Sequence, residues 1–77
     1  MKMETKLTLF NMELHEIKSA VMAGLTVHWA NSNYVVFWNG SYIEPRFDIL
    51  CLSNSHMWGL EKMDGTMTEN PEKFYLG

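Results

Sequence analysis

Residues 34–40 read YVVFWNG, and this stretch decides the expected fold. Its first five residues are β-branched or aromatic, which favours a strand. Asn39-Gly40 is then the strongest short-range signal for a hairpin, because both central positions of a type I′ turn need positive φ. The returning strand should end before Pro45, which cannot donate to a β-ladder. The expected cross-strand pairs are Trp38–Ser41, Phe37–Tyr42, Val36–Ile43 and Val35–Glu44.

Before this hairpin the hydrophobic period is that of a helix. Apolar residues recur every three or four positions at Leu14, Ile17, Val21 and Leu25. This spacing predicts an amphipathic helix over residues 12–23. Asn11 is the expected N-cap, and Gly24 is the expected C-terminal stop because glycine tolerates positive φ.

Short strands and turn clusters fill the rest of the chain. The expected strands are residues 25–30, the hairpin 34–44, 47–52, 56–60 and 73–76, with turns at 31–33, 53–55 and 64–65. Residues 1–10 are expected to form a leader or an edge strand at 7–10. This spacing predicts a strongly curled antiparallel sheet of about four to five strands. The predicted fold is a single α+β domain over residues 1–77, with the helix packed on the sheet.

Composition limits the classes of function. The chain has 77 residues, of which 47% are hydrophobic and 19% charged, as in one small globular domain. Its net charge is −3, and Arg46 is the one Lys or Arg between Ser19 and Glu61. Duplex DNA binding needs a basic stripe, so this charge pattern argues against it. A single cysteine, no secretory signal and no apolar run long enough for a membrane predict a cytoplasmic protein.

Both faces of the predicted hairpin are apolar. One face carries Tyr34, Val36, Trp38 and Ile43, and the other carries Val35, Phe37, Tyr42 and Glu44. A sheet with one wet side should alternate apolar and polar residues, and a single helix cannot cover both faces. Either the sheet curls into a barrel or one face contacts a partner. The predicted partner-binding residues are Tyr34, Val36, Trp38, Tyr42, Ile43 and Trp58, of which Trp38, Tyr42 and Trp58 are the expected hot spots.

Signals for catalysis or metal binding are weak. Cys51, His56 and Asp48 are the residue types of a nucleophile, a base and an orienting group, but Cys51 lies in an apolar run where inert thiols are common. A metal site would have to combine these three residues with His28, and they share no known ligand spacing. We therefore expect no catalytic, metal-binding or cofactor-binding residue.

A longer pattern extends over most of the chain. Residues 24–31 read GLTVHWAN, followed by Tyr34, Val36, Gly59-Leu60, Asp64-Gly65-Thr66 and Phe74. From about residue 13 to residue 76 the chain resembles short uncharacterised proteins of bacteriophages, prophages and other bacterial mobile elements. Those proteins have a leading helix, a Gly-x-x-Val-x-Trp-x-Asn-x-x-Tyr-x-Val stretch and a Gly-Leu…Asp-Gly tail. The resemblance implies an origin in mobile elements, whose small acidic proteins often occupy a host protein, including components of CRISPR and other defence systems.

The sequence thus predicts a module that binds a bacterial host protein stoichiometrically in the cytoplasm, without turnover, cofactor or membrane. Inhibition of a defence system such as CRISPR is one expected role. A first alternative is a homodimer or larger homo-oligomer that pairs the same surface with itself. A second alternative is a single-stranded nucleic-acid binder that stacks bases on Tyr34, Phe37 and Tyr42, although few Lys or Arg residues lie nearby.

Overall fold

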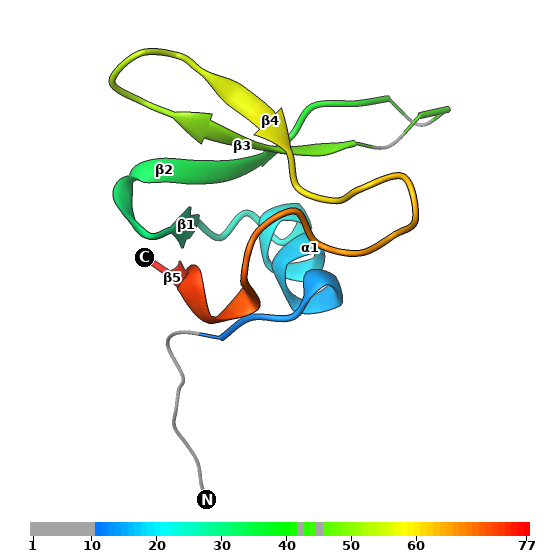
Figure 1. The fold of residues 1–77 in the computed structure, drawn as a ribbon, viewed down its shortest axis with the longest axis horizontal. Coiled ribbons are helices and arrows are strands. Elements are labelled where there is room, and N and C mark those ends of the chain that lie inside the picture. The colour runs from blue at the N-terminus through cyan, green and yellow to red at the C-terminus, as the bar shows by residue number, and fades with distance from the viewer. Residues whose placement is uncertain (1–10, 42, 45) are drawn as a thin grey trace, which may run out of the picture.

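The structure is a computed structural model that describes residues 11–41, 43–44 and 46–77. Its elements are the helix α1 (Leu14–Met22), the strands β1 (Val27–Trp29), β2 (Asn31–Trp38), β3 (Phe47–Cys51), β4 (Met57–Gly59) and β5 (Phe74–Leu76), and the short 3₁₀ helix η2 (Pro71–Lys73). The strands form one antiparallel sheet in the order β4-β3-β2-β1-β5. Figure 1 shows α1 within the curve of this open sheet. The predicted α+β class and the curled antiparallel sheet are confirmed.

The helix is held at both ends by local hydrogen bonds. Its N-cap is Glu13 instead of the predicted Asn11, because the Glu13 N–H donates to Glu16 Oε1 at 2.8 Å in a reciprocal capping box. The predicted stop at Gly24 is confirmed, since this residue has a φ of 87°. The Leu25 N–H donates to the Ala20 carbonyl oxygen at 2.9 Å, which completes a Schellman motif. The helix is therefore shorter than the predicted 12–23.

The predicted hairpin register is wrong. β2 pairs with β3, and the observed partners are Trp38–Phe47, Phe37–Asp48, Val36–Ile49, Val35–Leu50 and Tyr34–Cys51. Asn39 does not form a two-residue turn with Gly40, because its N–H donates to the Arg46 carbonyl oxygen and its side chain binds Asp48. The observed register pairs Val35 with Leu50 and Trp38 with Phe47, whereas the predicted register would have paired them with Glu44 and Ser41. Tyr42 and Pro45 lie outside the described residues.

The connection between β1 and β2 also differs from the prediction. Residues 31–33 begin β2, and the chain reverses at Ala30, whose φ is 66°. The Ala30 N–H donates to the Lys73 carbonyl oxygen at 2.9 Å, so pairing with the C-terminal segment fixes this position. The turns predicted at 53–55 and 64–65 are confirmed. The edge strand predicted at 7–10 lies outside the described residues.

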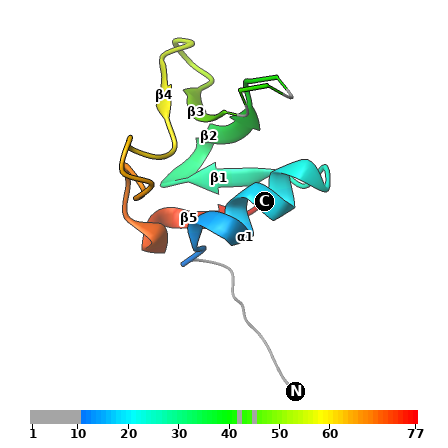
Figure 2. The same cartoon turned by 90° about the vertical axis from the view of Figure 1, so that its right-hand side faces the viewer.

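The core lies on one face of the sheet. It contains Ile17, Ala20, Val27, Val36, Phe47, Ile49, Leu60 and Phe74. We call the side of the sheet that α1 covers the inner face and the opposite side the outer face. Figure 2 shows α1 and the segment from residue 61 to η2 beside the strands β1 and β5. Lys18 Nζ lies 2.6 Å from Glu61 Oε1 and thereby joins α1 to that segment.

Candidate functional site

One residue from each strand lines up across the outer face. The register places Tyr75 beside His28, His28 beside Val35, Val35 beside Leu50, and Leu50 beside Met57. We call these five residues the outer row. Because adjacent strands lie about 4.8 Å apart, the row is about 19 Å long. Four of its side chains are half-buried and Met57 is 48% exposed. Among the described residues, no helix or strand covers this face.

Further apolar side chains extend the outer row along the strands. Phe37 lies two residues from Val35 and is half-buried, and Leu52 lies two residues from Leu50 and is 54% exposed. Alternate residues of a strand share a face, so Phe37 belongs to the outer face. Leu52 directly follows β3, and its N–H donates to the Asn33 carbonyl oxygen at 2.8 Å, which continues the pairing with β2 and places Leu52 on the same face. The outer row contains no Asp, Glu, Lys or Arg. The result is a row of apolar and aromatic side chains, with His28 among them, that crosses all five strands of the sheet.

A buried carboxylate borders this surface. Asp48 is 1% exposed, although it lies opposite Phe37 on the outer face. Its two oxygens accept hydrogen bonds from Asn39 Nδ2 at 2.7 Å and from Arg46 Nε at 3.0 Å. The Arg46 side chain is 63% exposed, so its charge remains in water. These bonds close the base of the 39–46 loop and satisfy the buried carboxylate.

The predicted partner-binding residues are divided between the core and a loop. Val36 is 6% exposed and belongs to the core, so it is not accessible to a partner. Trp38, paired with Phe47, is half-buried. Ile43 is 90% exposed in the 39–46 loop, and Tyr42 lies outside the described residues.

The other two predicted residues, Tyr34 and Trp58, form an aromatic cluster with Trp29 on the inner face. The Trp29 ring lies 4.8 Å from the Tyr34 ring and 5.4 Å from the Trp58 ring, both nearly perpendicular. Trp58 Nε1 donates to Glu69 Oε2 at 3.1 Å. Trp29 Nε1 is buried without a hydrogen-bond partner among the described residues. Most contacts of this cluster are therefore internal to the fold.

The outer row was missed by sequence reasoning for a specific reason. Strand alternation put Val35 and Phe37 on one face, but the predicted partner-binding residues of the hairpin included Tyr34, Val36 and Trp38 of the opposite face. Leu50, Met57 and Tyr75 join Val35 only through pairing between distant strands. The same geometry divides the predicted base-stacking platform, because Tyr34 lies on the inner face and Phe37 on the outer face. A signal was present in β2, where apolar residues occupy both the even-numbered and the odd-numbered positions. Such a strand needs both of its faces to be buried or to contact another surface.

The Cys51 thiol has polar neighbours, and the Cys51 backbone N–H donates to the carbonyl oxygen of His56 at 2.7 Å. The Cys51 side chain is 4% exposed, and Sγ lies 3.3 Å from Ser53 Oγ and 3.4 Å from Asn33 Nδ2. The hydrogen bond with the Ser53 side chain, aided by backbone N–H groups of Ser53 and Asn54, lowers the pKa of this thiol although burial opposes the shift. The ring of His56, the expected base, packs on Trp58 at 5.6 Å between centroids.

The four residues considered for a metal do not share one side of the sheet. His28 and Asp48 belong to the outer face, whereas Cys51 pairs with Tyr34 on the inner face. His28 Nδ1 donates to the Tyr34 carbonyl oxygen at 2.9 Å, which fixes its ring in the outer row. Over the described parts of the chain, no three His, Cys, Asp or Glu side chains come close enough to hold a metal ion.

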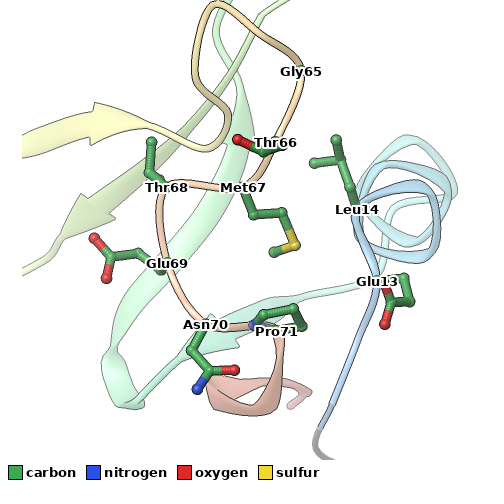
Figure 3. Close-up of a pocket in the computed structure, with 9 residues that line it drawn as sticks. All are labelled: Glu13, Leu14, Gly65, Thr66, Met67, Thr68, Glu69, Asn70 and Pro71. Atoms are coloured by element: carbon green, nitrogen blue, oxygen red, sulfur yellow. The ribbon is translucent and has the colours of Figure 1, made fainter.

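A hollow of about 540 Å³ lies between the start of α1 and residues 65–71. Its lining is Glu13, Leu14, Gly65, Thr66, Met67, Thr68, Glu69, Asn70 and Pro71. Figure 3 shows the Met67 side chain at its centre, with Leu14 beside it. Polar lining residues already serve the fold: Thr68 Oγ1 donates to the Gly59 carbonyl oxygen at 2.7 Å, and Asn70 Oδ1 accepts from the Glu72 N–H at 2.9 Å. This arrangement leaves few polar groups to orient a ligand.

Comparison of the chain with protein-family models, with curated proteins and with solved structures gives no match. No helix within the described residues has the length and apolar character to cross a membrane. The geometry of this chain is therefore the sole support for the outer row as a candidate site.

Proposed function

We propose that this chain is a protein-binding module whose contact surface is the outer row together with Phe37 and Leu52. The observation that carries the proposal is the in-register row of uncharged, mostly apolar side chains, one residue per strand, on the face opposite α1. Burial of apolar surface contributes about 25 cal/mol per Å², so contact with a partner over this face is favourable. Contiguous apolar surface of this kind is typical of protein contact sites.

The proposed action is stoichiometric occupation of a partner. The outer row has no acidic, lysine or arginine side chain and is suited to apolar contact, and the aromatic and Met residues at its ends are of types enriched in interfaces. The resemblance to mobile-element proteins supports a bacterial host protein in the cytoplasm as the partner, with a component of a defence system as one candidate. The proposed module has neither turnover nor cofactor.

The test is binding to the partner after its capture from bacterial extract and purification. Leu50→Lys and Met57→Lys each place a charge in the outer row and should weaken binding at least tenfold. Met22→Lys is the matched control, because Met22 is 58% exposed at the end of α1 and lies outside the outer face. Circular dichroism should report a native fold for all three variants.

The proposal fails if the two outer-row variants bind with wild-type affinity while folded. It also fails if Met22→Lys weakens binding as much as Leu50→Lys does. In that second case the partner would contact the helix side of the molecule.

A further inference from the structure

Asn39 and Gly40 do not form the expected two-residue turn, but their sequence carries a second chemical property. We propose that Asn39 is a modification site, at which the side-chain amide deamidates spontaneously through a cyclic imide with Gly40 and the carboxylate that forms weakens the hydrogen bonds of Asp48. Asn39 and Gly40 are both exposed and directly follow β2. The site lies at the base of the 39–46 loop, and its reaction does not depend on the proposed function.

The reaction requires only this chain and water. The Gly40 backbone nitrogen gives up its proton to a base in the solvent and attacks Asn39 Cγ. A bond forms between that nitrogen and Cγ, the Cγ–Nδ2 bond breaks, and Nδ2 takes up a proton and leaves as ammonia. Water then adds to either carbonyl carbon of the imide and opens the ring to aspartate or isoaspartate. Glycine has no Cβ, so no side chain hinders the approach of its nitrogen.

The Gly40 nitrogen is available for this attack, unlike nitrogens that follow other asparagines. Among the described residues, the Gly40 N–H has no hydrogen-bond partner. The Met12 N–H donates to the Pro71 carbonyl oxygen at 3.0 Å, and the Ser55 N–H donates to the Cys51 carbonyl oxygen at 2.9 Å, although each follows an asparagine. Pro71 also follows an asparagine and has no N–H. These three asparagines should therefore react more slowly than the one before Gly40.

The two asparagines of β2 are restrained by the strand. Asn31 Oδ1 accepts a hydrogen bond from the Asn33 N–H at 2.9 Å, and Asn33 Nδ2 donates to Ser53 Oγ at 3.1 Å. The residues that follow them, a serine and a tyrosine, carry side chains that hinder the attack. Sequence and structure thus agree on Asn39 as the most reactive asparagine of the chain.

Two hydrogen bonds slow the reaction in the folded chain. Asn39 Nδ2 donates to Asp48 Oδ2 at 2.7 Å, and the Asn39 N–H donates to the Arg46 carbonyl oxygen at 2.7 Å. They restrain the side-chain amide and the backbone, which must rotate to bring Cγ to the Gly40 nitrogen. Loss of the Asp48 acceptor should therefore accelerate deamidation.

The carboxylate that forms at position 39 faces a buried one. Asp48 is 1% exposed, and its oxygens accept from Asn39 Nδ2 at 2.7 Å and from Arg46 Nε at 3.0 Å. Deamidation replaces the amide donor by an oxygen that cannot donate while ionised, and the aspartate product places its negative charge beside Asp48. Like charges at such a distance destabilise the folded chain. Isoaspartate also lengthens the main chain, so both products loosen the base of the loop.

The experiment is peptide mapping by mass spectrometry of the whole folded chain, stored in mildly alkaline buffer at physiological temperature. In wild type, Asn39 should deamidate before any other asparagine. Gly40→Ala should slow the reaction several-fold, because its Cβ hinders the nitrogen, and Asp48→Ala should accelerate it several-fold. Ile17→Val is the matched control, because it weakens the core far along the chain from this loop and should leave the rate unchanged.

Circular dichroism should report a native fold for every variant. Another asparagine that reacts before Asn39 overturns the proposal, as does a Gly40→Ala chain that reacts at the wild-type rate. Equal acceleration by Ile17→Val and Asp48→Ala also contradicts it, because the reaction would then proceed through the unfolded chain. If Asp48→Ala does not fold, wild type and Gly40→Ala carry the test.

Unfolding in urea tests the effect of the new carboxylate. Asn39→Asp reproduces the aspartate product, and Asn39→Ala removes the same donor without adding a charge. Asn39→Asp should be the less stable of the two, and a second change, Asp48→Asn, should restore stability because it exchanges the positions of the amide and the carboxylate. An Asn39→Asp chain as stable as Asn39→Ala refutes this effect, and so does a double variant no more stable than Asn39→Asp.

Discussion

Trp58 Nε1 donates a hydrogen bond to Glu69 Oε2 at 3.1 Å, and this bond ties β4 to the segment that precedes η2. The Thr68 N–H donates to the Leu60 carbonyl oxygen at 3.0 Å, and the Thr68 hydroxyl donates to the Gly59 carbonyl oxygen at 2.7 Å. Together these bonds cover the end of β4, which is an edge strand. An edge strand with free backbone groups invites unwanted pairing, so the segment protects this side of the sheet.

Removal of the Trp58 indole N–H should destabilise the fold. In Trp58→Phe the Glu69 carboxylate loses its donor, while Trp29→Phe removes a buried donor that has no partner. Both changes remove similar volume, so their difference isolates the hydrogen bond. Trp58→Phe should lower the free energy of unfolding by about 1–2 kcal/mol more than Trp29→Phe, measured by urea denaturation. Equal losses for the two variants would mean that the bond contributes nothing.

Asp48 should contribute to stability through its two donors. Asp48→Ala removes the acceptor of Asn39 Nδ2 and of Arg46 Nε, and leaves the bond from the Asn39 N–H to the Arg46 carbonyl oxygen to hold the base of the 39–46 loop. We expect a loss of about 1–3 kcal/mol in the free energy of unfolding, since Arg46 can still be hydrated. Glu44→Ala, in the exposed part of the same loop, is the control and should change stability by less than about 0.5 kcal/mol. A loss as small as that of the control would contradict this role of Asp48.

The Cys51 thiol should make stability depend on pH. Its pKa is lowered in the folded chain from an ordinary value of 9.0, mainly by the hydrogen bond with Ser53. A group whose pKa is depressed on folding contributes stability above the unfolded value and loses it as pH falls through the folded value. The difference in unfolding free energy between wild type and Cys51→Ser should therefore increase as pH rises toward 9. A difference that is constant with pH would show that the thiol does not titrate differently on folding.

Asp64 should titrate below its ordinary range because of Thr66. The Thr66 hydroxyl donates to Asp64 Oδ1 at 2.6 Å and the Thr66 N–H donates at 2.9 Å, and both lower the pKa of this carboxyl from 3.8. Its contribution to stability is present above pH 3.8 and disappears as pH falls through the folded value. Thr66→Val should raise the pKa of Asp64 toward 3.8, as followed by NMR titration. An unchanged titration curve would assign the shift to the backbone bond alone.

Features controlled by nearby residues were predictable from the sequence. Gly24 ends α1 because a C-terminal Schellman motif depends on one glycine and its immediate neighbours. The turn at Asp64-Gly65 depends in the same way on Gly65, whose φ is 88°, and on the bonds to Thr66. The α+β class followed from the change of hydrophobic period after Gly24.

Features controlled by distant residues were not predictable. Asn39-Gly40 carries the local signal of a two-residue turn, but Asp48 binds the Asn39 side chain and β3 offers better apolar partners for β2. The outer row depends on the register of all five strands, so its residues lie far apart in the chain and form no local sequence pattern. The surface proposed for partner binding thus emerges only when β4 and β5 are placed at the two edges.

Ala30 has consequences for engineering this fold. With a φ of 66° it occupies the left-handed region, which costs an L-residue about 1–2 kcal/mol. Glycine adopts that conformation without this cost and would retain the N–H that binds Lys73. Ala30→Gly therefore offers a gain in thermal resistance that leaves both faces of the sheet untouched, and it would supply a robust background for variants that weaken the fold.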